Sequence, residues 1–281
     1  MSKKTLYCFI PLSVLGLLVG SFYDLSISQS ICDQNSMFGV IFAGFGQTPC
    51  MFCYLASVAL SLASFDKNKM KPSVLMLGFS VLDLIATALY FKDSYENMRN
   101  KILGSVILVA ISLIFTVAVY LTASKSDKDK LRKLALFLGV TPMLIFLSYE
   151  AIKQFRGRPR YRMIITRDDI SFENWWNFAS DVKSQFSSII AKEEFKSFPS
   201  GHTASAAGTL ILPILCTVIA PFRKRENIIK VICCIFPVVV AFARIVSGAH
   251  FLSDVSVGLL DATIVIIIMK RVFGYDKVIK N

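Results

Sequence analysis

The sequence predicts an all-α protein, a polytopic transmembrane helical bundle of about eight spans. Apolar residues make up 54% of the 281 residues and charged residues only 18%, a balance that soluble domains rarely have. Apolar runs long enough to cross a bilayer recur along the whole length. Lysine and arginine gather between alternate runs, as they do in the cytoplasmic segments of membrane proteins.

Eight apolar runs approach the roughly 20 residues that a helix needs to cross the hydrocarbon core. They are Thr5–Tyr23, Thr48–Phe65, Ser73–Phe91, Ile102–Ala123, Leu134–Ile152, Thr203–Phe222, Ile228–Gly248 and Ser253–Lys270. The first run follows a basic start but has no evident small-x-small cleavage site, so we interpret it as an uncleaved span. We expect one integral membrane domain over 1–281, with N-terminal spans in 1–130 and a functional core in 131–281.

The charge between the runs predicts the orientation, because lysine and arginine favour the cytoplasmic side. With the N-terminus inside, the inner segments are the basic ones, and the outer segment Asp24–Gln47 holds no lysine or arginine. The strongly basic outer segment is Lys153–Lys196. We therefore predict both termini in the cytoplasm. The net charge of +12 is split between two membrane faces, which favours contact with membrane lipids over nucleic acid.

Polar residues inside the predicted spans leave alternatives open. Asp83 and Asp261 are carboxylates within apolar runs, where a functional role is the default suspicion and a hydrogen-bonded packing role is the alternative. Cys50 and Cys53 form a C-x-x-C pattern at the start of a span. We favour small apolar packing residues over a redox pair there, because most of the seven cysteines lie within spans.

The segments outside the membrane include two with apolar character. Met37–Phe45 is apolar enough to lie along the membrane interface, and the outer loop 161–197 holds both tryptophans, Trp175 and Trp176. Tryptophan at a membrane surface usually anchors the chain. In the same loop, Asp181–Phe195 has apolar residues at helical spacing, which predicts a short amphipathic helix that caps the bundle or lies on the bilayer.

One short stretch places titratable chemistry at a predicted helix start. Pro199 and Gly201 favour a turn, and Ser200 can cap a helix that begins near His202. A helix N-terminus offers unpaired N–H groups and a positive dipole end, so it suits a phosphate. The predicted topology brings the second of the two histidines, His250, to the same face of the membrane.

Three blocks in order resemble the motifs of the type-2 phosphatidic acid phosphatase superfamily, which carries Lys-x6-Arg-Pro, then Pro-Ser-Gly-His, then Ser-Arg-x5-His-x3-Asp. Their residues here are Lys153 and Arg160, then Pro199–His202, then Arg244, His250 and Asp254. Tyr161 replaces the proline of the first block and Ala243 replaces the serine of the third. The blocks use both histidines of the chain.

The resemblance implies that His250 forms a phosphohistidine and that His202 protonates the departing alcohol, after which water releases phosphate. Asp254 follows four residues after His250, so we expect its carboxylate to accept from one imidazole nitrogen and fix the tautomer. The residues expected to bind the phosphate are Lys153, Arg160, Ser200, Gly201 and Arg244. We expect Glu150 to orient Lys153 or a nearby arginine, and Arg158 either to assist or to face lipid head groups. No clustered acidic ligands accompany the blocks, so neither a metal nor a cofactor is implied.

We therefore expect an enzyme, a metal-independent phosphatase that hydrolyses a phosphate monoester or diphosphate of a lipid at the outer face of the cell membrane. Candidate substrates are phosphatidic acid, phosphatidylglycerol phosphate and a polyprenyl diphosphate. One alternative is a lipid phosphotransferase, in which an alcohol replaces water. Another is a non-enzymatic lipid transporter, which the carboxylates within the spans fit but which leaves the two histidines in phosphatase blocks unexplained.

Overall fold

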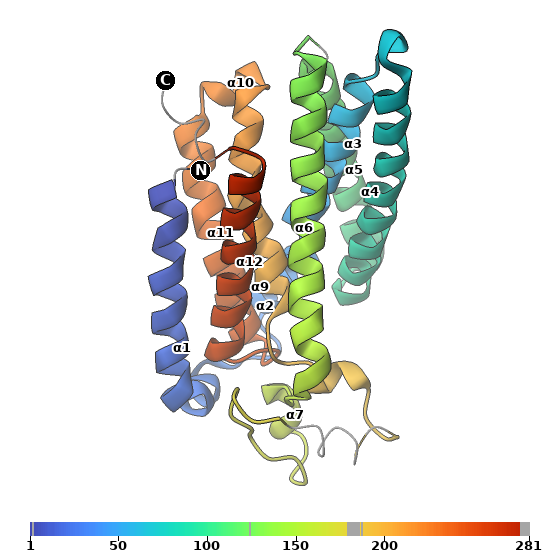
Figure 1. Cartoon of the computed structure of the whole chain (residues 1–281). Coiled ribbons are helices and arrows are strands. Elements are labelled where there is room, and N and C mark those ends of the chain that lie inside the picture. Colours follow the sequence, from blue (N-terminus) through green and yellow to red (C-terminus); the bar gives the residue numbers. More distant parts are fainter. Residues whose placement is uncertain (2, 124, 179–185, 187, 276–281) are drawn as a thin grey trace.

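The structure is a computed structural model that describes residues 1, 3–123, 125–178, 186 and 188–275, and this part is helical without strands. The predicted all-α class is confirmed (Figure 1). The helices are α1 (Lys3–Ile31), α2 (Met37–Phe45), α3 (Thr48–Ala63), η1 (Lys67–Lys69), α4 (Met70–Asn97), α5 (Lys101–Ala123), α6 (Lys128–Arg156), α7 (Tyr161–Ile164), η2 (Lys192–Phe195), α9 (Gly201–Ala206), η3 (Ala207–Leu210), η4 (Leu212–Thr217), α10 (Ala220–Arg223), α11 (Glu226–Val246) and α12 (Leu252–Val272).

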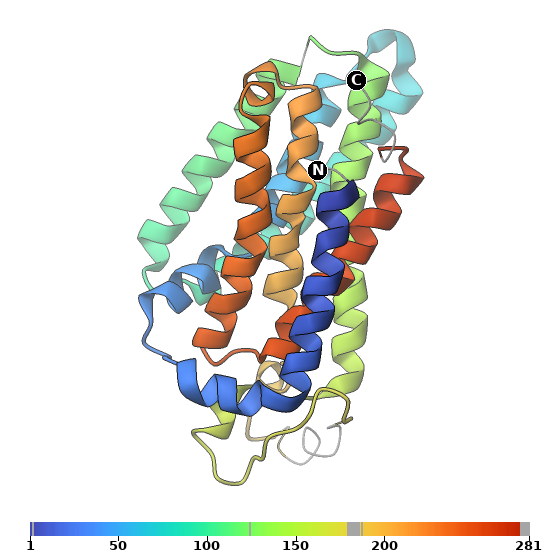
Figure 2. The same cartoon turned by 90° about the vertical axis from the view of Figure 1, so that its left-hand side faces the viewer.

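Within the described residues, seven helical stretches are long and apolar enough to cross a membrane. They correspond to seven of the eight predicted spans. The remaining one, Thr203–Phe222, is a run of short segments from α9 to α10 instead of one α-helix. The α-helix ends at Ala206, and the tighter 3₁₀ turns η3 and η4 replace it, with Pro213 in the first turn of η4. Figures 1 and 2 show that this run still passes through the bundle from one end to the other.

One end of the bundle holds the start of α1 and the end of α12, and the other end holds α7 and the start of α9. α1 begins and α12 ends toward one end, where the Lys270 ammonium donates to the Met1 carbonyl at 2.6 Å. The turn between α3 and α4 and the turn between α5 and α6 lie at that same end (Figures 1 and 2). α7 and the start of α9 lie at the opposite end. The three motif blocks therefore converge at the end away from the basic turns.

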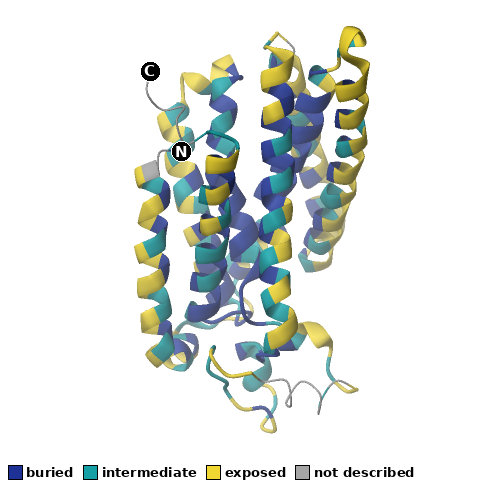
Figure 3. Ribbon diagram, in the orientation of Figure 1, coloured by how far each residue is buried: buried dark blue, intermediate teal, exposed yellow. Residues whose placement is uncertain are grey.

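Helix α3 packs against α4, α5 and α6, and its side chains are buried along nearly its whole length (Figure 3). The outer helices expose apolar faces instead: Phe22 of α1, Leu75 of α4 and Ile102 of α5 are 80, 74 and 81% exposed. Such faces suit contact with lipid tails, which are as apolar as these side chains. The chain is a multi-pass membrane protein.

The pairing of α1 with α12 depends on small residues one turn apart. A Cβ on Gly16 would lie 2.3 Å from the Ser256 hydroxyl, and one on Gly20 would lie 2.7 Å from the Ser253 nitrogen. Glycines four apart allow helix backbones to approach closely in membranes. The close approach carries Asp24, one turn beyond Gly20, to the start of α12.

Several polar residues of the spans have packing partners. The Cys50 thiol donates to the Ser205 carbonyl at 3.2 Å, and both Cys50 and Cys53 are fully buried and unpaired. Asp261 accepts a hydrogen bond of 2.7 Å from the Ser148 hydroxyl of α6. Asp83 is buried, with one carboxylate oxygen lacking a partner among the described residues.

The two predicted segments outside the spans have different outcomes. Met37–Phe45 is helix α2. Of the amphipathic helix predicted over Asp181–Phe195, residues 181–185 and 187 lie outside the described part of the chain. Residues 188–190 form a turn and a bend, and Lys192–Phe195 form the 3₁₀ turn η2.

Candidate active site

The predicted cap at the start of α9 is confirmed. Ser200 is the N-cap, and its hydroxyl oxygen accepts from the Thr203 nitrogen at 3.4 Å. The Ser200 nitrogen donates to the Asp254 carbonyl at 2.9 Å, which fixes the start of α9 against that of α12. At Gly201 a Cβ would lie 2.8 Å from the Lys153 ammonium. The missing side chain therefore makes room for Lys153 at the helix start.

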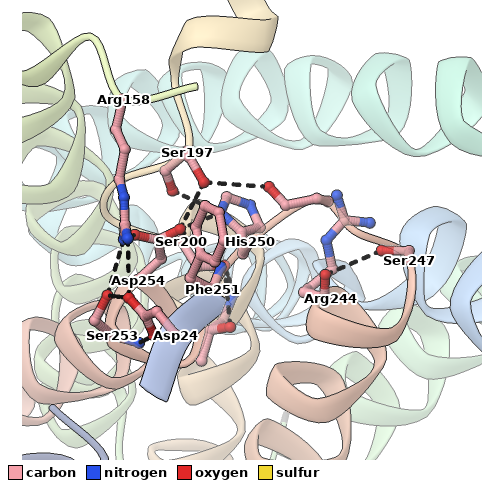
Figure 4. Close-up of polar contacts among 12 residues, drawn as sticks. Asp24, Arg158, Ser197, Ser200, Arg244, Ser247, His250, Phe251, Ser253 and Asp254 are labelled. Atoms are coloured by element: carbon pink, nitrogen blue, oxygen red, sulfur yellow. Dashed lines mark hydrogen bonds and ion pairs between the residues drawn. The ribbon is translucent and has the colours of Figure 1, made fainter. Parts of the chain in front are cut away.

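The ring of His250 is held by a backbone carbonyl. His250 Nδ1 lies 2.6 Å from the Ser197 carbonyl oxygen, and the residue is 1% exposed (Figure 4). A carbonyl oxygen can only accept, so Nδ1 carries the proton and Nε2 keeps its lone pair. This tautomer leaves the Nε2 lone pair available to act as a nucleophile.

The charge state of His250 suits the same role. Burial lowers the pKa of His250 well below its ordinary value of 6.5, and the positive charges of Arg160, Arg244 and Lys153 lower it further. Both effects disfavour the imidazolium. His250 is therefore neutral at neutral pH.

Asp254 does not form the direct bond to His250 that the four-residue spacing predicts. Its Oδ2 lies 3.9 Å from His250 Nδ1, beyond hydrogen-bonding distance. The same oxygen accepts from the Ser197 hydroxyl at 2.6 Å and from the Phe251 nitrogen at 2.8 Å. Asp254 thus holds the segment whose carbonyl orients the imidazole.

Arg158 neither faces lipid head groups nor is free to bind phosphate. It is 1% exposed, and its guanidinium donates to Asp254 Oδ1 at 2.5 Å, to Asp24 Oδ2 at 2.9 Å and to the Ser253 hydroxyl at 2.8 Å. Asp24 also accepts from the Ser253 nitrogen at 2.9 Å. Figure 4 shows Arg158 and Asp24 converging on Ser253 and Asp254. Arg158 therefore ties α1 to the start of α12.

His202 faces the N-terminal helices. Its Nε2 lies 3.1 Å from the Ala43 carbonyl of α2, 3.3 Å from Gln47 Nε2 and 3.9 Å from Asp93 Oδ2 of α4. The Gln47 amide also donates a short hydrogen bond to Asp93. A carboxylate and a carbonyl therefore lie beside the ring expected to donate a proton.

The positive charges of Lys153, Arg160 and Arg244 each act electrostatically on His202 and on His250. Lys153 lies 3.1 Å from Glu150, which confirms the expected partner. The Nε atoms of Arg160 and Arg244 are buried and have no hydrogen-bond partner among the described residues. Unpaired guanidinium donors of this kind suit bidentate binding of a phosphate.

Comparison with known proteins agrees with this geometry. The family model described as the PAP2 superfamily matches residues 131–277. The chain belongs to the PAP2 superfamily. It is also 29% identical over 104 residues to phosphatidylglycerophosphatase B of Bacillus subtilis strain 168, a match that covers 36% of this chain and 48% of that relative. The chain thus matches about half the length of this relative, and no solved structure matches it.

The two departures from the PAP2 motifs are packed into the protein. Tyr161 is the first residue of α7, is 6% exposed, and its ring lies edge-on to Phe251 at 6.0 Å. Ala243 is fully buried in α11. In this PAP2 protein the tyrosine replaces the stiffness of proline with an aromatic contact beside His250.

The two tryptophans differ in their surroundings. Trp175 donates to the Ser21 hydroxyl at 2.9 Å and stacks on Phe198 at 5.8 Å. Trp176 is 46% exposed, and the nearby Phe178 is 66% exposed. Trp175 therefore packs the loop onto α1 and onto the segment before His202, whereas Trp176 is exposed.

Sequence reasoning missed three residues that contact the site from outside the PAP2 match: Asp24, Gln47 and Asp93. For Asp24 and Asp93 the available signal was a carboxylate at the end of a predicted span, since Asp24 directly follows Thr5–Tyr23 and Asp93 follows Ser73–Phe91 within two residues. It also left Ser197 without a role, because a backbone carbonyl has no side-chain signature.

Proposed function

We propose that this PAP2 protein is a lipid phosphatase that hydrolyses a phosphate monoester or diphosphate through a phosphohistidine on His250. The single observation that carries the proposal is the hydrogen bond between His250 Nδ1 and the Ser197 carbonyl, which leaves Nε2 as a nucleophile. The unpaired guanidinium donors of Arg160 and Arg244 support it.

The proposed reaction has two steps. His250 Nε2 attacks phosphorus while the lipid–oxygen bond to phosphorus breaks, and His202 gives its proton to the departing alcohol. Lys153, Arg160 and Arg244 neutralise the charge on the phosphoryl oxygens. Water then attacks the phosphohistidine and gives a proton to His202, which restores both histidines and releases phosphate. These cations supply the charge that a metal supplies elsewhere, so we propose activity without a metal.

The lipid class and the orientation rest on other observations. The name of the Bacillus relative supports a phospholipid phosphate as substrate, and the apolar outer faces of the bundle place the protein among lipids. The basic inner segments of the sequence support cytoplasmic termini and an active site at the outer face.

The activity is tested with the purified protein and a panel of lipid phosphates, each with and without a chelator. We expect phosphate release that the chelator does not abolish, and no release by His250→Ala. Labelled substrate should leave acid-labile label on wild type and none on His250→Ala. Retained turnover by His250→Ala would overturn the mechanism, and a phosphorylated alcohol as product would indicate transfer instead of hydrolysis.

The orientation is tested by cysteine labelling in intact cells. A reagent that cannot cross the membrane should label a cysteine placed at Lys92 and should not label one placed at Arg225. The reverse pattern would contradict the proposed orientation.

A further inference from the structure

His202, the general acid of the proposed reaction, has cations on one side and hydrogen-bonding and acidic groups on the other. On one side His202 faces the three cations Lys153, Arg160 and Arg244, together with His250. On the other side, helices α2 and α4 present the Ala43 carbonyl, Gln47 and Asp93. Both helices lie outside the region 131–277 that matches the PAP2 family.

This surrounding poses an electrostatic problem. A proton donor must carry its proton before the leaving group departs. Three cations and burial all disfavour an imidazolium. Before substrate binds, Asp93 is the carboxylate within ion-pair distance of His202 in the described part of the chain. An anion at 3.9 Å favours the charged ring.

The contacts on this side are all made through one nitrogen. In the described residues, His202 contacts Ala43, Gln47 and Asp93 through Nε2. A carbonyl oxygen and a carboxylate oxygen both favour a proton on the nitrogen they face. The Gln47 amide nitrogen donates to Asp93; it also lies 3.3 Å from His202 Nε2 but makes no hydrogen bond to that nitrogen when the nitrogen is protonated, because both groups are then donors.

We propose that Asp93 is a positioning residue that keeps His202 protonated at Nε2 and oriented for proton donation, and that Gln47 holds the Asp93 carboxylate in place. The proposal rests on the lipid phosphatase function proposed above. When the P–O bond breaks, the imidazolium gives its other proton, from Nδ1, to the alcohol oxygen. His202 is then neutral with Nε2–H retained, Asp93 stays ionised throughout, and water restores the Nδ1 proton during hydrolysis of the phosphohistidine.

The test compares leaving groups, because only a residue that acts on the general acid is sensitive to them. Turnover by Asp93→Asn is measured on a long-chain lipid phosphate, whose alkoxide leaves poorly, and on p-nitrophenyl phosphate, whose phenolate leaves without help. General acids contribute about 10²–10⁴-fold, so a roughly 10- to 100-fold loss of kcat is expected on the lipid and less than about 3-fold on the nitrophenyl ester. Asp93→Glu should recover part of the loss.

A matched control and a pH profile sharpen the comparison. Glu96 lies one turn further along α4 and pairs with the exposed Lys92 at 3.8 Å, so Glu96→Gln removes the same charge and should leave both activities unchanged. Loss of the Asp93 anion should also move the basic limb of kcat to lower pH. The groups that set this limb are Asp93 from α4, Arg244 from α11, and Lys153 and Arg160 from α6 and the start of α7.

The outcomes are distinct. Equal losses of Asp93→Asn on both substrates, with an unshifted basic limb, would overturn the proposal and reduce Asp93 to a structural residue. If Asp93→Asn does not fold, Gln47→Met tests the proposal in its place, because it keeps the Asp93 carboxylate. Its turnover should then fall by less than that expected for Asp93→Asn, and only on the lipid phosphate. Absence of any release by wild type, or full activity of His250→Ala, would overturn the phosphatase proposal itself.

Discussion

Arg158 and Arg160 lie two residues apart, but replacing Arg158 should lower stability whereas replacing Arg160 should lower activity. The Arg158 guanidinium donates to Asp24, Asp254 and Ser253 at 2.5–2.9 Å in a fully buried position. Arg158→Met leaves both carboxylates buried without their cation, and breaking a buried pair costs about 3–5 kcal/mol. For a chain of this size that corresponds to a fall in Tm on the order of 10 °C.

Arg160→Met should spare stability and remove activity. No hydrogen bond from its guanidinium to a described residue is present in the structure, and its buried Nε is unpaired. Removing one donor to a developing anion typically costs about 10²–10³-fold in turnover. We therefore expect unchanged Tm with a fall of at least about 100-fold in kcat/KM.

The assay pairs thermal unfolding in detergent with phosphate release from the same preparation. Arg156, which is partly exposed and bonds the Trp176 carbonyl at 3.2 Å, supplies the control, and Arg156→Met should change neither quantity much. A wild-type Tm for Arg158→Met together with a raised KM would refute this reasoning, because it would mean that Arg158 binds phosphate.

Three further expectations follow from the same geometry. Gly201→Ala should lower kcat/KM by roughly 10²-fold, because the added Cβ would lie 2.8 Å from the Lys153 ammonium and displace it, and small misplacements are costly. Phosphate release measures this loss, and unchanged kinetics would contradict the expectation. The acidic limb of kcat/KM should lie below pH 6.5, because the lowered pKa of His250 keeps the ring neutral until acid pH; a limb above pH 6.5 would show that His250 is not the group titrating. Trp176→Ala should reduce turnover of long-chain lipid in bilayers more than turnover of a short soluble ester, whereas Trp175→Ala should reduce both alike; equal losses for Trp176→Ala would exclude a membrane role.

The helices and the motif residues could be predicted from sequence because their signals are local. An apolar run of about 20 residues specifies a span whatever surrounds it, and Ser200 caps α9 as its residue type predicts. The broken sixth span was missed because its apolar content matches that of the others. Pro213 does not distinguish it either, because Pro142 and Pro237 lie inside the unbroken helices α6 and α11.

The predicted bond between His250 and Asp254 failed for a geometric reason. Residues four apart face each other only when both are helical, and α12 begins at Leu252, two residues after His250. Asp254 is helical and His250 is not, so the carboxylate reaches Ser197 and the Phe251 nitrogen instead. The spacing alone carries no information on where the helix begins.

The residues that sequence reasoning missed depend on contacts between distant segments. Asp24 reaches Ser253 because Gly20 lets α1 approach α12, and the two residues are 229 positions apart. Asp93 lies beside His202 because α2 and α4 pack at the same end of the bundle as α9. A carboxylate from α1 thus supports the Arg158–Asp254 pair, and one from α4 lies beside His202. Replacing 1–130 with unrelated spans should therefore remove activity even if the three motif blocks stay folded, because Arg158 would lose Asp24 and His202 would lose Ala43, Gln47 and Asp93.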